Sequence, residues 1–392
     1  MRLKLSLVCA LLAGVPAFGA IPFDCNRGIP LQTAIEFALP GENLQLSGTC
    51  AGPLVISRNL TLSSKTKAVI EGEGKDAVTV KGPARVTLSG LTIQHGNNGV
   101  LGENGAQLTI TNSAVQGNAV MGILLEGNSA ATISDSSADK NGLNGLDAEA
   151  SSSVILAGAF ETKMNAVFGI NINASSSLTF TQAHVTVSQN TLGVQISTSA
   201  SAFISDPVTV LTVDQNATTG LTIVSGAHMV AFGGTIQARG NGVHGISVDS
   251  KAGLDLDAAA LVTSVGNKQD GVHLEETSVL TMFNTPAFSG APGFTTLNVQ
   301  DNGANGVSIL TGSNFTVIHQ ATLNSTGNAA DGVYVDNGSA VTLIQTSVVA
   351  LNARDLVLSF GSRGDITGTS FGTLTCDATV LLRGDTKLTC PR

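Results

Sequence analysis

The chain has no tryptophan and a single tyrosine, Tyr334, and aromatic residues make up only 4% of its 392 residues. Charged residues are also scarce, at 12%, and acidic residues outnumber basic ones, so that the formal net charge is −9. The core must therefore be built from aliphatic side chains. Nucleic acid is excluded as an expected partner, because phosphate binding needs a basic stripe that is absent here. The apolar content of 42% argues against a disordered chain.

The first twenty residues have the three parts of a secretory signal peptide. Arg2 and Lys4 provide positive charge, and the apolar run LSLVCALLAGVPAF is too short for a comfortable membrane span. The small residues of AFGA suit cleavage after Gly19 or Ala20. We therefore expect residues 1–20 to be a signal peptide and the mature protein to be secreted, periplasmic or at the cell surface, without a transmembrane segment.

Four cysteines remain after the signal peptide, as one pair near each end: Cys25, Cys50, Cys376 and Cys390. An exported protein meets an oxidising compartment, where such cysteines form disulfides. Three connectivities are possible. The pairs lie far apart in the sequence, which favours the local bonds Cys25–Cys50 and Cys376–Cys390.

A glycine followed by Val, Ile or Leu recurs at intervals of 23 to 27 residues, with one longer interval of 35. These glycines are Gly99, Gly122, Gly145, Gly169, Gly193, Gly220, Gly245, Gly271, Gly306 and Gly332. An asparagine recurs with these glycines. It lies four residues before the glycine in most repeats and three residues before it at Asn190. Asparagine tolerates left-handed turns, and stacked asparagines can bond to one another. Two markers in step indicate a true internal repeat.

Apolar residues alternate with mixed or polar ones after each glycine, as in Val272 and Leu274 or Val333 and Val335. This period of two predicts a half-buried strand. A second short strand follows a turn rich in serine or glycine, as in SSLTFT and SAVTLI. A unit of about 24 residues cannot bury its own apolar face, but stacked units can, which predicts a solenoid of some twelve or thirteen layers. A leucine-rich repeat would need a helix and a Leu-x-x-Leu-x-Leu frame, and neither is present.

With these repeats the chain resembles the right-handed parallel β-helix proteins of the pectate-lyase-like superfamily over roughly residues 30–390. The resemblance implies an all-β fold in which a short amphipathic helix, here LQTAIEFAL, caps the open end of the solenoid. We therefore expect an N-terminal cap at 21–50, β-helix repeats at 51–375 and a C-terminal cap at 376–392.

Outward-facing titratable residues concentrate between the repeats that begin at Gly245 and Gly332. In the stretch QDGVHLEE, the alternation points His273 and Glu275 outward and leaves Asp270 at the bend. We predict that Asp270, His273 and Glu275 form a solvent-facing acid–base set acting on a sugar. The alternative is a solvated polar face without catalytic function.

Three further residues are predicted to bind substrate: Asp249, Asp331 and Tyr334. The repeat that begins at Gly271 has 35 residues, and its extra segment NTPAFSGAPGF is expected to loop out beside the same face.

Glu103, Glu126 and Glu149 fall on three successive repeats, with Asp147 nearby. Like charges at strand spacing repel, and a Ca²⁺ ion would relieve that repulsion through oxygen ligands. The alternative is that exposed glutamates turn into water, and we expect no other cofactor.

No catalytic motif of the resembled families is present, neither the Gly-His-Gly and Arg-Ile-Lys of polygalacturonases nor the Asp-Pro-His-Asp of alginate epimerases. Two functions therefore remain open. The first is an exported protein that binds or processes a cell-surface or extracellular polysaccharide, as a lyase, hydrolase or epimerase. The second is a non-catalytic structural or adhesive rod that holds a surface partner.

Overall fold

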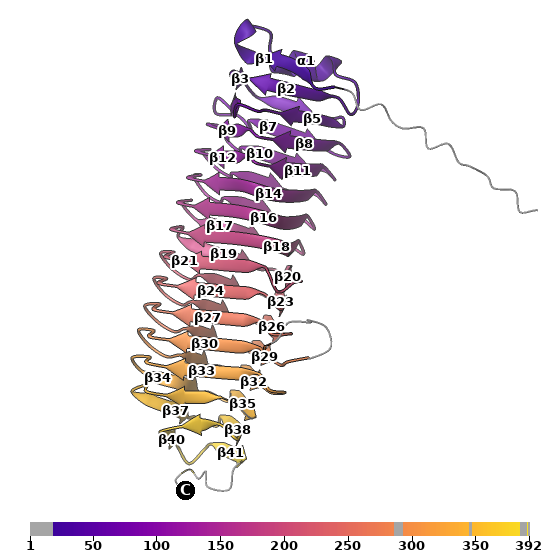
Figure 1. Cartoon of the computed structure of the whole chain (residues 1–392). Coiled ribbons are helices and arrows are strands. Elements are labelled where there is room, and N and C mark those ends of the chain that lie inside the picture. Colours follow the sequence, from indigo (N-terminus) through magenta and orange to yellow (C-terminus); the bar gives the residue numbers. More distant parts are fainter. Residues whose placement is uncertain (1–18, 286–292, 345–346, 385–389, 391–392) are drawn as a thin grey trace, which may run out of the picture.

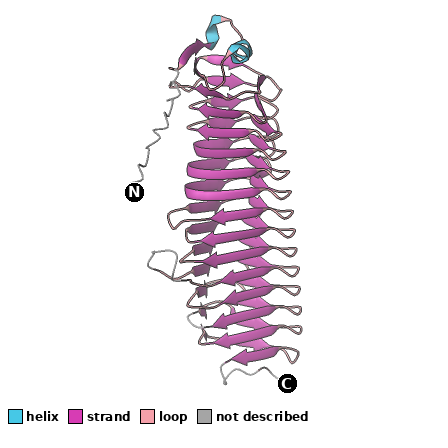
Figure 2. Ribbon diagram, turned by 90° about the vertical axis from the view of Figure 1, so that its right-hand side faces the viewer, coloured by secondary structure: helices cyan, strands magenta, loops and turns pink. Residues whose placement is uncertain are grey.

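The computed structural model describes residues 19–285, 293–344, 347–384 and 390, which form an elongated rod (Figures 1 and 2). Nearly all of the expected signal peptide lies outside the described residues. Every strand pairing in the rod is parallel, as in the pair between β25 (Ile246–Val248) and β28 (Val272–Leu274). The chain therefore winds as a parallel β-helix, with each coil stacked on the one before.

One face of the rod is a 14-stranded sheet built mainly of strands three to five residues long, which we call the short-strand sheet. It has fourteen rungs rather than the expected twelve or thirteen, because the register continues into both ends. At a strand spacing of about 4.8 Å, the stack is roughly 65 Å long. In order, its strands are β4 (Leu54–Ile56), β7 (Val78–Lys81), β10 (Val100–Glu103), β13 (Ile123–Leu125), β15 (Leu146–Ala148), β17 (Phe168–Ile172), β19 (Leu192–Ile196), β22 (Leu221–Ile223), β25, β28, β31 (Val307–Ile309), β34 (Asp331–Val335), β37 (Arg354–Leu358) and β40 (Leu374–Cys376).

The rest of the coil belongs to a 27-stranded sheet with two parallel ladders. Most coils thus carry three strands, one more than the two that the sequence indicated. Three long strands run through both ladders and join them: β14 (Ala130–Asp139), β16 (Ser153–Lys163) and β18 (Ser177–Ser188).

The first ladder also contains β1 (Ile21–Asp24), β2 (Asn43–Ser47), β5 (Leu60–Ser63), β8 (Arg85–Ser89), β11 (Gln107–Thr111), β20 (Ser201–Ile204), β23 (His228–Phe232), β26 (Gly253–Asp257), β29 (Val279–Met282), β32 (Asn314–Val317), β35 (Ala340–Ile344), β38 (Arg363–Thr367) and β41 (Leu381–Gly384). The second contains β3 (Thr49–Ala51), β6 (Val69–Glu71), β9 (Thr92–Gln94), β12 (Ala114–Gln116), β21 (Val210–Asp214), β24 (Thr235–Arg239), β27 (Leu261–Val265), β30 (Thr296–Gln300), β33 (Thr322–Thr326), β36 (Val348–Ala350) and β39 (Ser370–Phe371).

Aliphatic side chains at equivalent positions stack inside the rod, as the alternation predicted. Ile246 pairs with Val272, Val272 with Val307, and Val307 with Val333, and all four are fully buried. Burial of such a column stabilises each rung mainly through its two neighbours.

The glycine and asparagine markers have one structural cause. Each asparagine from Asn118 to Asn328 donates a hydrogen bond from Nδ2 to Oδ1 of the asparagine on the next rung, at 2.9 to 3.3 Å. Asn190 joins this ladder despite its shifted position. A Cβ on Gly245 would lie 2.6 Å from Nδ2 of Asn267, so the glycine makes room for the asparagine of the following rung.

The N-terminal end of the rod carries a 3₁₀ turn, η1 (Cys25–Arg27), and a short helix, α1 (Leu31–Phe37), which lies over the first coils in Figure 1. Leu31 and Ile35 of α1 are buried, as expected for a capping helix. Disulfides join Cys25 to Cys50 and Cys376 to Cys390, which confirms the local pairing. The boundaries of the two caps remain predictions. Within the described ranges, no helix has the length and apolarity needed to cross a membrane.

Candidate functional site

Two columns of side chains run along the outer surface of the short-strand sheet. The first lies at the middle of each strand, where Ser247 pairs with His273, His273 with Ser308, and Ser308 with Tyr334. This is the order that the glycine register predicts. The second, which we call the bend column, consists of the residues just before the glycines, and in this region it contains His244, Asp270, Asn305 and Asp331.

The bend column is tied together by its own ladder of hydrogen bonds. The backbone N–H of Asp270 donates to Nδ1 of His244 at 3.3 Å, and that of Asn305 donates to Oδ1 of Asp270 at 3.0 Å. The N–H of Asp331 donates to Oδ1 of Asn305 at 3.0 Å. Elsewhere Asn98 and Asn144 accept the same bond from the next rung. The ladder forms where the bend residue has an acceptor, and here a histidine and an aspartate take the place that asparagine holds elsewhere.

Asp270, His273 and Glu275 are brought together, as predicted. Nδ1 of His273 lies 2.9 Å from Oδ2 of Asp270, and Nε2 of the same ring lies 3.3 Å from Oε2 of Glu275. His244 from the preceding rung stacks on His273, with ring centroids 4.3 Å apart and planes inclined by 20°. The imidazole of His273 is thus held on both nitrogens and on one face.

The two histidines differ in charge because their surroundings differ. Burial and, after it, the positive charge of His273 lower the pKa of His244 to about 4, against the charge of Asp270, which raises it. Burial also disfavours the charged form of His273, but the hydrogen bonds and charges of Asp270 and Glu275 outweigh it and raise the pKa of His273. The pKa of Asp270 is lowered, because bonds from His273 and the Asn305 N–H outweigh burial.

The members of the cluster differ in their access to solvent. The side chains of Asp270 and His273 are only 9% and 15% exposed, whereas that of Glu275 is 41% exposed. The expectation of a fully solvent-facing set was therefore wrong for Asp270 and His273, because the stacked rungs and His244 cover them. Glu275 is the carboxylate that a ligand on this surface would meet first.

His244 was not among the predicted site residues, although it occupies the same bend column one rung before Asp270. The signal was the histidine in VHG directly before Gly245, because the register of the repeat places it beside the His273 rung.

The side chains of the three predicted substrate-binding residues bond to partners outside the cluster of Asp270, His273 and Glu275. Asp331, with a side chain only 3% exposed, accepts two hydrogen bonds from Nε and Nη2 of Arg354, at 2.6 and 2.9 Å. Tyr334 donates from its hydroxyl to Asp336 at 2.8 Å, and Asp249 accepts a hydrogen bond from Ser250. Asp331 therefore holds the guanidinium of Arg354 in place, and the Arg354 side chain is 53% exposed. Arg354 was not among the residues predicted from the sequence.

The insertion of the long repeat joins two strands that lie outside the short-strand sheet. Strands β29 and β30, which flank the insertion, both belong to the 27-stranded sheet, so the extra residues interrupt a different side of the coil. The middle of the insertion, residues 286–292, lies outside the described residues.

The glutamate column proposed for Ca²⁺ contains Glu103, Glu126 and Glu149. Burial raises the pKa of Glu126, and the charges of Glu149 and Glu103 raise it further. Glu103 lies 3.4 Å from Nζ of Lys81. A metal site needs several ligand atoms close together. Among the described residues, one group of three has ligand atoms within 4.8 Å of one another, and it consists of His244, Asp270 and His273 rather than the glutamates. The glutamates thus do not converge to that distance.

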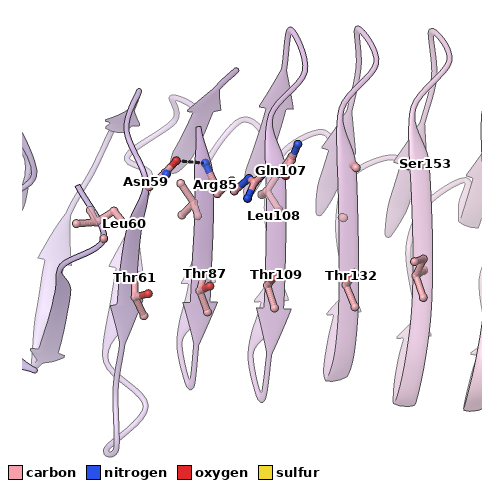
Figure 3. Close-up of a pocket in the computed structure, with 15 residues that line it drawn as sticks. Asn59, Leu60, Thr61, Arg85, Thr87, Gln107, Leu108, Thr109, Thr132 and Ser153 are labelled. Carbon is pink, nitrogen blue, oxygen red and sulfur yellow. Dashed lines mark hydrogen bonds between the residues drawn. The ribbon is translucent and has the colours of Figure 1, made fainter. Parts of the chain in front are cut away.

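A shallow groove of about 320 Å³ lies on the 27-stranded sheet, over β5, β8, β11, β14 and β16 (Figure 3). Thr61, Thr87, Thr109 and Thr132 form a row along it. Arg85, whose backbone N–H donates to Asn59, is the one charged residue in its lining. The groove has hydroxyl groups for binding but no pair of titratable groups for acid–base chemistry.

Sequence comparison supports the β-helix fold over part of the chain. A family model described as a right-handed β-helix region matches residues 55–206. No curated protein sequence matches the chain significantly. Among solved structures, the A-module of mannuronan C-5 epimerase AlgE6 from Azotobacter vinelandii is 14% identical, with 90% of this chain and 93% of that chain covered and a TM-score of 0.49.

Two further similar structures are pectate lyase Pel9A and the Streptococcus pneumoniae surface adhesin PfbA. The lyase is 12% identical over 67% of this chain and 75% of its own, with a TM-score of 0.44. The adhesin is 13% identical over 90% of this chain and 86% of its own, with a TM-score of 0.29. The family match over residues 55–206 and the stacked parallel coils together show that the chain has a right-handed parallel β-helix fold.

Proposed function

We propose that this is an exported β-helix protein that binds and processes an extracellular or cell-surface polysaccharide on the outer face of the short-strand sheet. The observation that carries the proposal is the exposed carboxylate of Glu275, bonded to a half-buried histidine that a second carboxylate holds. The outer column runs along the rod axis, which suits a linear polymer. The two disulfides agree with an oxidising compartment outside the cytosol.

In this proposal Glu275 is the group that exchanges a proton with the sugar. The ring of His273, held by Asp270, orients that carboxylate through the contact at Nε2. Tyr334 and Asp249 offer a hydroxyl group and a carboxylate to sugar hydroxyls on neighbouring rungs. Asp331 contributes indirectly, because it fixes Arg354 at the surface.

The test is Glu275→Gln, which keeps the shape of the side chain and removes its basicity. Wild-type and variant proteins are assayed on a panel of neutral and acidic polysaccharides for new reducing ends, unsaturated products and epimerised residues. We expect turnover of one glycan class, and a loss of at least about 100-fold in rate for Glu275→Gln. Glu276→Gln is the matched control, because the adjacent Glu276 bonds to Ser250 rather than to His273. Absence of wild-type turnover on every glycan, or equal rates for the two variants, would contradict the proposal.

A non-catalytic rod that adheres to a glycan is the second candidate, and the threonine row of the shallow groove favours it. In that case a glycan array detects binding without turnover. Thr87→Val and Thr109→Val together would then weaken binding, whereas Glu275→Gln would not.

A further inference from the structure

We propose that His244, Asp270 and His273 bind one divalent transition-metal ion of the Zn²⁺ type. The inference depends on the geometry of this cluster alone. It holds whether or not the protein turns over a polysaccharide.

The donor atoms already converge on one carboxylate oxygen. Oδ2 of Asp270 lies 3.5 Å from Nδ1 of His244 and 2.9 Å from Nδ1 of His273. Ligand atoms about 2.0–2.1 Å from a zinc ion lie roughly 2.9–3.4 Å from one another in octahedral or tetrahedral geometry. The two measured distances nearly match that range, and one ligand atom from each residue lies within 4.8 Å of the other two. The His244 and His273 rings are stacked at 20°, so the His244 ring must turn out of the stack for its Nδ1 to face the same ion as Nδ1 of His273.

The three groups also have suitable donor chemistry. Nδ1 of His244 is unprotonated, because it accepts the Asp270 N–H, and a metal ion would take this lone pair in place of that hydrogen bond. Nδ1 of His273 donates its proton to Asp270, and an ion entering between them would displace that proton. Two imidazole nitrogens and one carboxylate oxygen suit zinc, cobalt, nickel or iron(II), whereas Ca²⁺ and Mg²⁺ prefer oxygen ligands alone.

Surrounding hydrogen bonds orient the ligands as they do around metal ions in other proteins. The second nitrogen of His273 bonds to Glu275, and the second oxygen of Asp270 accepts two bonds from Asn305, at 3.0 Å each. A carboxylate behind a ligating histidine fixes the ring and increases its basicity. Three protein ligands near an outward surface leave a coordination position for water or substrate.

The experiment uses the mature protein with any affinity tag removed and with bound metal stripped by a chelator. Zn²⁺ is titrated by calorimetry, and Co²⁺ by its visible absorption, which reports nitrogen and oxygen ligation. No glycan is present, so the result is separate from the test of the proposed function. We expect one ion per chain, no comparable heat with Ca²⁺, and an affinity about 10–100-fold lower in Glu275→Gln.

The decisive variant is His244→Asn. Asparagine occupies the same bend position at Asn98 and Asn144 and accepts the N–H of the next rung, so the coil remains intact while one ligand is lost. We expect this variant to lose stoichiometric binding and to keep the melting temperature of the stripped wild-type protein. His228→Asn is the control, because His228 pairs with Asp255 and, among the described residues, belongs to no group of three convergent ligands. A wild-type protein that binds no Zn²⁺, or a His244→Asn variant that binds as well as wild type, would overturn the proposal.

Discussion

Asp147 is a buried carboxylate on the outer column, paired in register with Asn171 and only 3% exposed. Burial raises its pKa to about 6, against hydrogen bonds from Asn171 and Asn144 that lower it, and the charge of Glu149 adds to the rise. The folded protein therefore binds the proton more tightly than the unfolded chain does, whose aspartates titrate near 3.8.

A carboxyl with a raised pKa makes stability fall as the pH rises. Its contribution is complete below about pH 4 and is lost between about pH 4 and 6, and the pKa difference corresponds to roughly 3 kcal/mol. Asp147→Asn should remove this part of the pH dependence and raise the free energy of unfolding at pH 7. Urea denaturation of both proteins at pH 4, 5, 6 and 7 measures it. Parallel curves for the two proteins would show that Asp147 is already ionised in the fold at low pH.

At the scale of the element, each coil is held in register where a glycine meets the asparagine of the next rung. A Cβ on Gly245 would contact Oγ of Ser264 and would lie 2.8 Å from the carbonyl oxygen of Gly271. These neighbours are backbone or buried side chains with hydrogen bonds of their own, so they have little freedom to move. The glycine is thus required by close approach rather than by an unusual backbone angle.

Gly245→Ala should therefore destabilise the protein by about 1–3 kcal/mol through overpacking, despite adding only one methyl group. Ser247→Ala, on the outer face of the same rung, should change stability by less than about 0.5 kcal/mol. Urea denaturation compares the two, and hydrogen exchange should place the Gly245→Ala defect in β25 and β28. Equal stability of the two variants would contradict the packing argument.

At the scale of the whole molecule, the rod is a stack in which each coil contacts only its neighbours, so its ends are where unfolding begins. The Cys25–Cys50 disulfide links η1 to β3 at one end, and Cys376–Cys390 acts at the other. A loop of 25 residues closed by a disulfide is worth about 3 kcal/mol in the chain-entropy account.

Removal of that bond by Cys25→Ser with Cys50→Ser should accelerate hydrogen exchange in β1, β2 and β3 while leaving β25 and β28 unchanged. Mass spectrometry of exchanged peptides resolves the two regions. A uniform rise in exchange along the rod would mean that the coils unfold as one cooperative unit rather than from the end.

The repeat period and its markers were enough to predict the coil. The glycine and asparagine markers, the alternation of Val272 and Leu274, and the outer order of Ser247, His273, Ser308 and Tyr334 all follow from a repeat that contacts only its neighbours. In such a fold, position within the repeat sets position in space, so register can be read along the chain.

The way in which outward side chains meet depends on packing between rungs, which the repeat period does not reveal. Alternation says that His273 points outward, but it does not say that the rungs bury most of it or that His244 stacks on it. Arg354 pairs in register with Asp331 on the neighbouring rung, so the repeat places them side by side, but the register alone does not show the two hydrogen bonds between their side chains. The sequence thus set which residues share a column, and packing between rungs set their burial, charge and partners.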